Sequence, residues 1–137
     1  MIEAAGLHGR VRLTGTVADV ERYLQASDIF VFTSELEAFG GGLTEAMACG
    51  LPVVCSHVEC GSADYMVEGV HGLRFAIGDA KDLQAQLTKL LANVPVQKAM
   101  GVAGRDLAKE QVSLDHVVDD HEKVFMATMG KWKAAAW

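Results

Sequence analysis

The sequence predicts an α/β domain in which helices cover a parallel β-sheet. Segments with strand-like and helix-like patterns alternate along the chain, which favours strand–helix–strand units. Residues 29–32 form an unbroken apolar run, as expected of a strand that is covered on both faces. Half of the 137 residues are apolar and 22% are charged, which is typical of one globular domain.

The strands and helices are expected in a regular order. The predicted strands are residues 11–14, 29–32, 52–56 and 73–76. The predicted helices follow Thr16, cover residues 43–49 and 62–67, follow Asp79, cover residues 95–109 and follow Ser113. Thr16, Asp79 and Ser113 are expected to cap the helices that they precede, and Gly50 is expected to end helix 43–49 in a left-handed conformation. We expect residues 1–130 to form the domain and residues 131–137 an irregular tail.

Charge and cysteine content exclude several classes of protein. The net charge of −6 and the absence of a large basic cluster argue against a nucleic-acid partner. No apolar run is long enough for a transmembrane helix, and the N-terminus does not resemble a signal peptide. Cys49, Cys55 and Cys60 lack zinc-site spacing, so they are expected to be small, buried hydrophobic residues in a cytoplasmic protein.

Two histidines lie close to acidic residues in the last predicted helix. His116 and His121 flank Asp119 and Asp120, which could in principle hold a metal ion. Their spacing is poor for a metal site, and we interpret them as a solvated helix face. No metal is expected anywhere in the chain.

Three glycines stand between the second predicted strand and the helix that follows it. Gly40, Gly41 and Gly42 come after the carboxyl end of a buried strand, where open α/β sheets bind ligands. Without side chains, this backbone can approach a ligand closely. The free N–H groups and the dipole of the following helix favour a phosphate there.

Two carboxylates accompany these glycines. Glu45 is expected in the first turn of the helix, where it could accept two hydrogen bonds from a ribose diol. Glu37 lies eight residues earlier, in a loop that can fold over the same pocket. Together they suggest a ligand with phosphates and hydroxyls, such as a nucleotide sugar. On residue chemistry alone, the alternative is a tight turn followed by a helix-stabilising charge. The dinucleotide and P-loop glycine patterns are both absent.

Residues 34–52 resemble a motif of the retaining GT-B glycosyltransferases called family 4, or glycosyl transferases group 1. The family pattern is S-x-x-E-G-F-G-x-x-x-x-E-A-M-A-x-G-x-P, with the E-x7-E signature inside it. The matching residues are Ser34, Glu37, Phe39, Gly40, Glu45, Ala46, Met47, Ala48, Gly50 and Pro52. Residues 11–15 are similar to the V-x-F-x-G strand of the family, and Gly61, Asp64, Gly69 and Gly72 to a later glycine motif.

The resemblance implies a function and a role for each site residue. The chain would be the nucleotide-sugar-binding half of a glycosyltransferase, with a Rossmann-like three-layer fold. Glu45 would hold the donor ribose, and Glu37, as the catalytic residue, would contact the donor sugar. The backbone of Phe39, Gly40, Gly41 and Gly42 would approach the sugar and the diphosphate. The donor would be a UDP-, GDP- or ADP-sugar, and no metal or other cofactor is expected.

The family pattern also indicates what this chain lacks. Family members have two Rossmann-like domains, and the first domain and the opening strands of the second have no counterpart here. An isolated chain is therefore expected to be inactive. With the middle of the sheet missing, we expect one of three arrangements. Residues 11–14 slide onto strand 29–32, two copies of the chain pair, or another chain supplies the missing half.

Two other functions are compatible with parts of the pattern. A non-catalytic module that binds a nucleotide or a partner, as a monomer or a homodimer, is the main alternative. A related GT-B enzyme, such as a sugar-nucleotide epimerase or a phosphorylase, fits the E-x7-E context less well.

Overall fold

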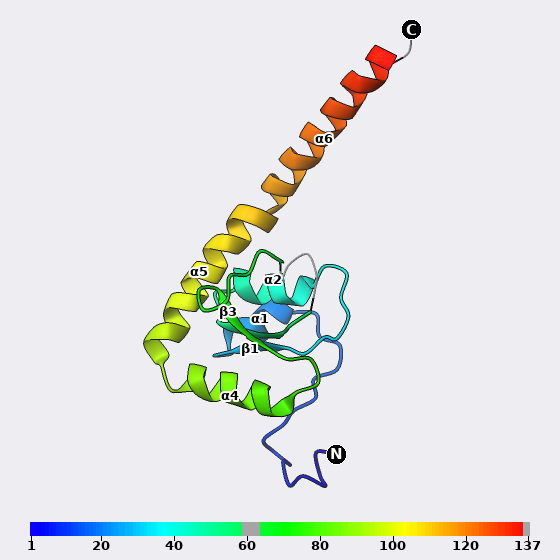
Figure 1. The fold of residues 1–137 in the computed structure, drawn as a ribbon. Coiled ribbons are helices and arrows are strands. Elements are labelled where there is room, and N and C mark those ends of the chain that lie inside the picture. Colours follow the sequence, from blue (N-terminus) through cyan, green and yellow to red (C-terminus); the bar gives the residue numbers. More distant parts are fainter. Residues whose placement is uncertain (59–63, 136–137) are drawn as a thin grey trace.

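The structure is a computed structural model that describes residues 1–58 and 64–135, and it has three layers (Figure 1). The middle layer is a parallel sheet of three strands, β1 Phe30–Phe32, β2 Val53–Ser56 and β3 Gly72–Phe75. Helix α2 (Gly41–Ala48) covers one face of this sheet, and α4 (Ala80–Leu91) covers the other. This architecture confirms the predicted α/β class.

The central strand of the sheet is β2. β2 lies between β1 and β3, with Val54 opposite Val31 on one side and Leu73 on the other. All four of its residues are buried, which explains why three of them are apolar and the fourth, Ser56, has only a small hydroxyl group. Gly72 opens β3 because a Cβ atom there would stand 2.5 Å from a methyl group of Val53.

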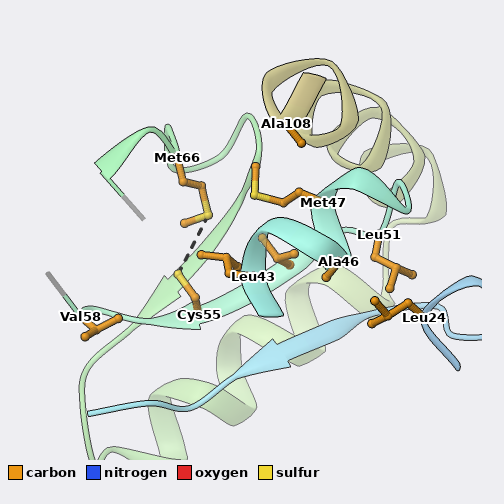
Figure 2. Packing of buried hydrophobic residues seen from close by; sticks show 10 residues of the cluster. Leu24, Leu43, Ala46, Met47, Leu51, Cys55, Val58, Met66 and Ala108 are labelled. Carbon is orange, nitrogen blue, oxygen red and sulfur yellow. Dashed lines mark hydrogen bonds between the residues drawn. The ribbon is translucent and has the colours of Figure 1, made fainter. Parts of the chain in front are cut away.

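Each face of the sheet has its own core. Leu43 and Met47 of α2 pack with Val53 and Cys55 on one face, where the Cys55 thiol lies 4.0 Å from the sulfur of Met66 (Figure 2). On the opposite face, Val54 packs with residues of β3, α4 and the first half of α5. The members of this second cluster are Val54, Leu73, Phe75, Leu90 and Met100. The alternation of Val53, Val54 and Cys55 between the two cores is the period of a strand.

The prediction of a strand at residues 11–14 is wrong. These residues form neither a strand nor a bridge, and the side chain of Leu13 is 83% exposed. A strand needs a partner for its N–H and C=O groups, and in the described residues β1 pairs with β2 alone. The predicted slide of residues 11–14 onto β1 therefore does not occur. Pairing with a second copy or with another chain stays a prediction.

Five helices have the following bounds in the described residues. They are α1 Val20–Gln25, α2 Gly41–Ala48, α4 Ala80–Leu91, α5 Val94–Val112 and α6 Leu114–Ala135. Thr16 does not cap α1, which begins after Asp19 without a side-chain cap. The helix predicted at residues 62–67 begins outside the described residues, where Cys60 and Gly61 also lie. Asp64 is helical, whereas residues 66 and 67 are not.

The other predicted caps are confirmed. Asp79 accepts hydrogen bonds from the N–H groups of Lys81 and Asp82, at 2.9 and 3.0 Å. Ser113 accepts one from the N–H group of His116 at 3.3 Å. Gly50 follows α2 with a φ of +79°, the left-handed conformation that ends a helix without steric cost in glycine.

The last helix continues where an irregular tail was predicted. α6 extends to Ala135, so the prediction of an irregular tail is wrong for residues 131–135. The helix projects from the body of the domain (Figure 1). Leu114, Val118 and Phe125 are among its exposed apolar residues. None of the helices in the described residues is long and apolar enough to cross a membrane.

A close approach of backbones holds α5 against the end of α2. A Cβ atom on Gly101 would overlap the carbonyl oxygen of Gly50. Three residues further along α5, Gly104 faces Met47, where a Cβ atom would make an ordinary contact of 3.6 Å. Small residues on this side of α5 therefore let it lie close to α2, and only Gly101 has no room for a side chain.

The cap of α4 can be tested directly. Replacing Asp79 by alanine leaves the first N–H groups of α4 without their acceptor, so we expect a loss of about 1 kcal/mol in the free energy of unfolding. Urea denaturation followed by circular dichroism measures it. The Asp106→Ala variant removes an exposed carboxylate from α5 and serves as the control. Equal stabilities of the two variants would contradict the capping role.

Candidate functional site

The glycine-rich segment begins α2 at the carboxyl end of the sheet. Gly40 is the N-cap residue with a φ of +81°, and the helix begins at Gly41, two residues earlier than predicted. Gly41 and Gly42 therefore belong to the first turn, whose N–H groups have no acceptor within the helix. Both have helical backbone angles, so the fold does not require glycine at either position.

The earlier start of α2 changes the place of Glu45. It is the fifth residue of the helix and therefore lies in the second turn, whereas the sequence predicts it in the first turn. Its side chain is exposed, and no hydrogen bond or ion pair joins its carboxylate to another described residue. The carboxylate can therefore accept hydrogen bonds from a ligand.

The loop between β1 and α2 is tied to the sheet at its start. The buried hydroxyl group of Ser56, at the end of β2, donates a hydrogen bond to the carbonyl oxygen of Ser34. Glu37 follows in this loop and is half-buried, and the ring of Phe39 is 48% exposed. The loop thus leaves the sheet at a defined point and ends at the first turn of α2.

Two grooves flank Glu45. One has a volume of about 410 Å³ and lies between α2 and the end of α5, and the other has about 430 Å³ and lies between α2 and α1. The residues of the first groove are Phe39, Gly41, Thr44, Glu45, Ala48, Ala108, Lys109, Val112 and Ser113. The residues of the second are Ala18, Val20, Glu21, Leu24, Glu45, Ala48 and Cys49. Glu45 is thus the carboxylate that both grooves share.

The structure brings together most of the predicted site residues. Phe39, Gly41 and Glu45 line one groove, and Gly40 and Gly42 adjoin Gly41 in the chain. Glu37 lines neither groove. Its place in the loop after β1 is as predicted, and its contact with a ligand stays a prediction.

Sequence reasoning missed the residues that helices α1 and α5 contribute. Lys109 and Ser113 come more than 60 residues after Glu45, and they reach the groove because α5 packs against α2. The sequence signal for this packing is the small side chains of Gly101, Gly104 and Ala108 at helical spacing on α5. Among the described residues that line this groove, Lys109 is the only cation.

Comparison with known proteins gives both a fold and a family. The chain is 32% identical over 114 residues to a lipopolysaccharide core biosynthesis glycosyltransferase, LpsE, of Rhizobium meliloti, covering 83% of this chain and 33% of the relative. It is 29% identical over 125 residues to N-acetyl-alpha-D-glucosaminyl L-malate synthase of Bacillus anthracis, covering 91% and 32%. The chain thus spans about a third of the length of these relatives.

Solved structures share the fold of this chain. The crystal structure of Anabaena Alr3699/HepE in complex with UDP superposes with a TM-score of 0.86 at 24% sequence identity, over 92% of this chain and 35% of that one. The same Anabaena protein has also been solved with UDP-glucose. These neighbours confirm the Rossmann-like GT-B fold predicted from the motif. The family model of glycosyl transferases group 1 matches residues 1–107, and the chain belongs to that family.

Proposed function

We propose that this chain is the donor-binding module of a glycosyltransferase and that it binds a nucleoside diphosphate sugar. The observation that carries the proposal is the placement of Glu45, whose carboxylate has no partner among the described residues, one turn from a glycine-only helix start at the carboxyl end of the sheet. The Anabaena protein of similar fold binds UDP and UDP-glucose, which favours a UDP-sugar over GDP- and ADP-sugars.

The diphosphate would lie against the first turn of α2. The N–H groups of Gly41 and Gly42 point out of the helix there, and the positive end of the helix dipole favours an anion. Lys109 supplies a positive charge to the same groove. We propose that these groups stabilise the leaving nucleoside diphosphate without a metal ion.

The hydroxyl groups of the donor would be held by the two glutamates. Glu45 would accept hydrogen bonds from the ribose diol, because an ionised carboxylate is an acceptor with two oxygens. Glu37 would act on the donor sugar as the catalytic residue, and Phe39 would lie beside it at the end of the same loop. The apolar side chains of Val20 and Leu24 in the second groove would suit the nucleoside base.

The module would not transfer sugar by itself. It spans about a third of its relatives, and transfer requires an acceptor site as well as a donor site. We propose that the open edge of β1 is covered by the complementary part of the enzyme or by a second copy of the chain. We also propose a cytoplasmic location, where the thiol of Cys49 remains reduced.

Calorimetric titration with UDP, GDP and ADP tests the donor site. We expect one nucleotide, UDP, to bind, and the Glu45→Ala variant to bind it at least about tenfold more weakly, which corresponds to about 1.4 kcal/mol. The loss of hydrogen bonds from the ribose to a charged acceptor is the physical reason.

The control is Glu122→Ala, which removes an exposed carboxylate from α6 at a position that lines neither groove. It should bind UDP as the parent chain does. Unchanged affinity in Glu45→Ala, or no binding of any nucleotide to the folded parent chain, would contradict the proposed donor site. The second outcome would favour a non-catalytic module that binds a protein partner.

A further inference from the structure

Helix α6 presents a stripe of apolar side chains to solvent along the part that projects from the domain (Figure 1). The stripe consists of Leu114, Val118, Phe125 and Met129, which are each 54–78% exposed. Spacings of four and seven residues return to nearly the same side of an α-helix, because one turn takes about 3.6 residues. The four side chains therefore form one continuous apolar surface.

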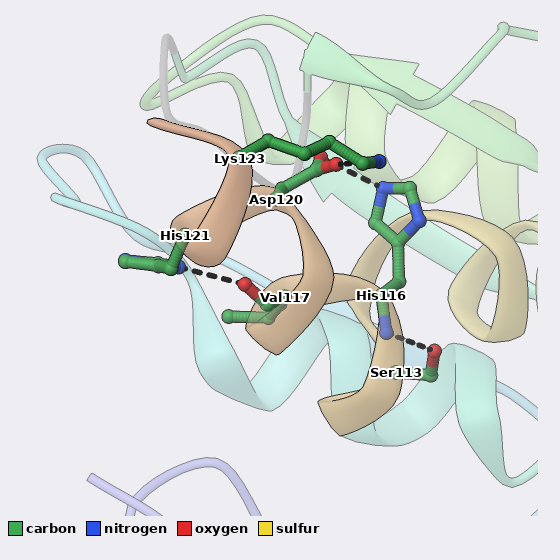
Figure 3. Close-up of polar contacts among 6 residues, drawn as sticks. All are labelled: Ser113, His116, Val117, Asp120, His121 and Lys123. Carbon is green, nitrogen blue, oxygen red and sulfur yellow. Dashed lines mark hydrogen bonds and ion pairs between the residues drawn. The ribbon is translucent and has the colours of Figure 1, made fainter. Parts of the chain in front are cut away.

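The polar groups beside the stripe find their partners within α6. One carboxylate oxygen of Asp120 lies 3.2 Å from Nε2 of His116, and the other accepts a hydrogen bond from Nζ of Lys123 at 2.9 Å (Figure 3). Nδ1 of His121 lies 2.7 Å from the carbonyl oxygen of Val117. The apolar stripe is thus the part of α6 that gains most from contact with another surface.

The charges of α6 change sign along its length. Residues 114–122 include four acidic residues and no lysine or arginine, whereas residues 123–135 include three lysines and no acidic residue. The hydrogen bond from Lys123 is the main cause that lowers the pKa of Asp120, so this carboxylate is ionised at neutral pH. Two antiparallel copies of α6 would place opposite charges together, and two parallel copies would place like charges together.

The helical repeat makes the charges and the stripe agree on one register. Position 133 follows Asp115 by five turns, so the two positions lie on the same side of α6. In an antiparallel pair that crosses near Phe125, Asp115 of one copy would stand level with Lys133 of the other. The two apolar stripes would face each other in the same register.

A second copy of the chain fits this surface better than a lipid surface does. The four acidic residues of the first half of α6 would be repelled by anionic lipid headgroups. A helix of 22 residues is about 33 Å long, and a pair of such helices buries on the order of 1,000 Å². This area is at the lower end of specific interfaces, which predicts a weak dimer.

We propose that two copies of this chain associate through an antiparallel pair of α6 helices, with their apolar stripes in contact. The proposal does not rest on the donor site, because no residue of the stripe lines either groove beside Glu45.

Sedimentation velocity of the 137-residue chain over a range of concentrations tests this association. We expect a monomer of 14.6 kDa in equilibrium with a dimer, with a dissociation constant on the order of 10 μM. Phe125→Asp places a charge in the middle of the stripe and should raise the dissociation constant at least about tenfold, because the charge would be buried in the pair. Circular dichroism checks that the variant keeps its helices.

Met126→Asp is the matched control. Met126 is 67% exposed, close to the 64% of Phe125, but it points about 100° away around the helix. The same new charge there should leave the dimer nearly unchanged.

A charge exchange tests the antiparallel direction. Asp115→Lys should weaken the dimer about threefold or more, because it places a lysine level with Lys133 of the second copy. Adding Lys133→Asp to the same chain should restore the dimer. A weakened start of α6 could not be repaired by a change five turns away, so recovery would identify the pairing.

A chain that stays monomeric at 200 μM, about twenty times the expected dissociation constant, would overturn the proposal. So would a dimer that persists in Phe125→Asp, which would place the interface elsewhere, for instance at the open edge of β1. A dimer that Phe125→Asp disrupts but the charge exchange leaves unchanged would overturn the antiparallel arrangement. Binding of UDP by a strictly monomeric chain would retain the donor site and reject this interface.

Discussion

A chain in which alanine replaces Gly101 is expected to be about 3 kcal/mol less stable than the parent chain. The added methyl group would overlap the carbonyl oxygen of Gly50, and a backbone atom cannot move aside as a flexible side chain can. The overlap forces α5 away from α2, which loosens the packing around Met47 and Ala108. Overpacking of this kind costs about 1–3 kcal/mol or more, a large part of the stability of a small domain.

Gly104→Ala is the matched control for this prediction. Its methyl group would meet Met47 at an ordinary contact distance, and alanine favours a helix over glycine by up to about 1 kcal/mol. We expect this variant to be as stable as the parent chain or more stable. Urea denaturation of both variants measures the difference, and equal unfolding midpoints would show that the Gly50–Gly101 approach does not limit the fold.

Replacing both Gly41 and Gly42 by alanine is expected to separate binding from stability. A Cβ atom would meet nothing within 4 Å at Gly41 and only the ring of Phe30, at 3.8 Å, at Gly42. The helix should therefore be retained, and its stability should stay equal or rise by up to about 1 kcal/mol. The methyl groups would stand where the diphosphate approaches the backbone, so we expect the affinity for UDP to fall at least about tenfold.

Calorimetry with UDP and urea denaturation of the same preparation check both parts of this result. Gly104→Ala again serves as the control, because it is a glycine-to-alanine change in a helix away from both grooves. If the double variant bound UDP like the parent chain, the two glycines would have no part in ligand binding. If it unfolded, their role would be structural, and the proposed approach of the diphosphate would lose its support.

Features that depend on a few neighbouring residues could be predicted from the sequence. The caps at Asp79 and Ser113 and the left-handed Gly50 each satisfy backbone groups within a few residues, so local chemistry decides them. The buried strands were visible because β2 is covered on both faces and admits only apolar residues and one small hydroxyl. These elements carry the three-layer arrangement, and the fold class followed from them.

Features that depend on distant partners could not be predicted. Residues 11–14 alternate like a strand, yet a strand forms only where a neighbouring strand offers its hydrogen-bonding edge. The helix beyond residue 130 was missed because lysines and tryptophans near a chain end resemble an irregular tail. Its residues are nevertheless compatible with a helix that continues from a well-capped start at Ser113.

In the candidate site too, residues close together in the sequence could be predicted, and residues from distant helices could not. The glycines and Glu45 are close in sequence, and the motif located them, although the early start of α2 moved Glu45 beyond the first turn. Lys109 and the apolar residues of α1 enter the grooves only through the packing of α1 and α5 on α2. No spacing rule within one segment could have placed them beside Glu45.

The hydrogen bond from Ser56 to the carbonyl oxygen of Ser34 restricts which amino acids are allowed at position 56 but not at position 34. Every amino acid offers a carbonyl oxygen, so the bond imposes no side chain at position 34, whereas the buried donor at position 56 needs a hydroxyl group. Residues 35–38 can therefore exchange their side chains while the loop keeps its origin on the sheet. A scaffold arranged in this way can acquire new ligands by substitution in one short loop, at little cost to the architecture that supports it.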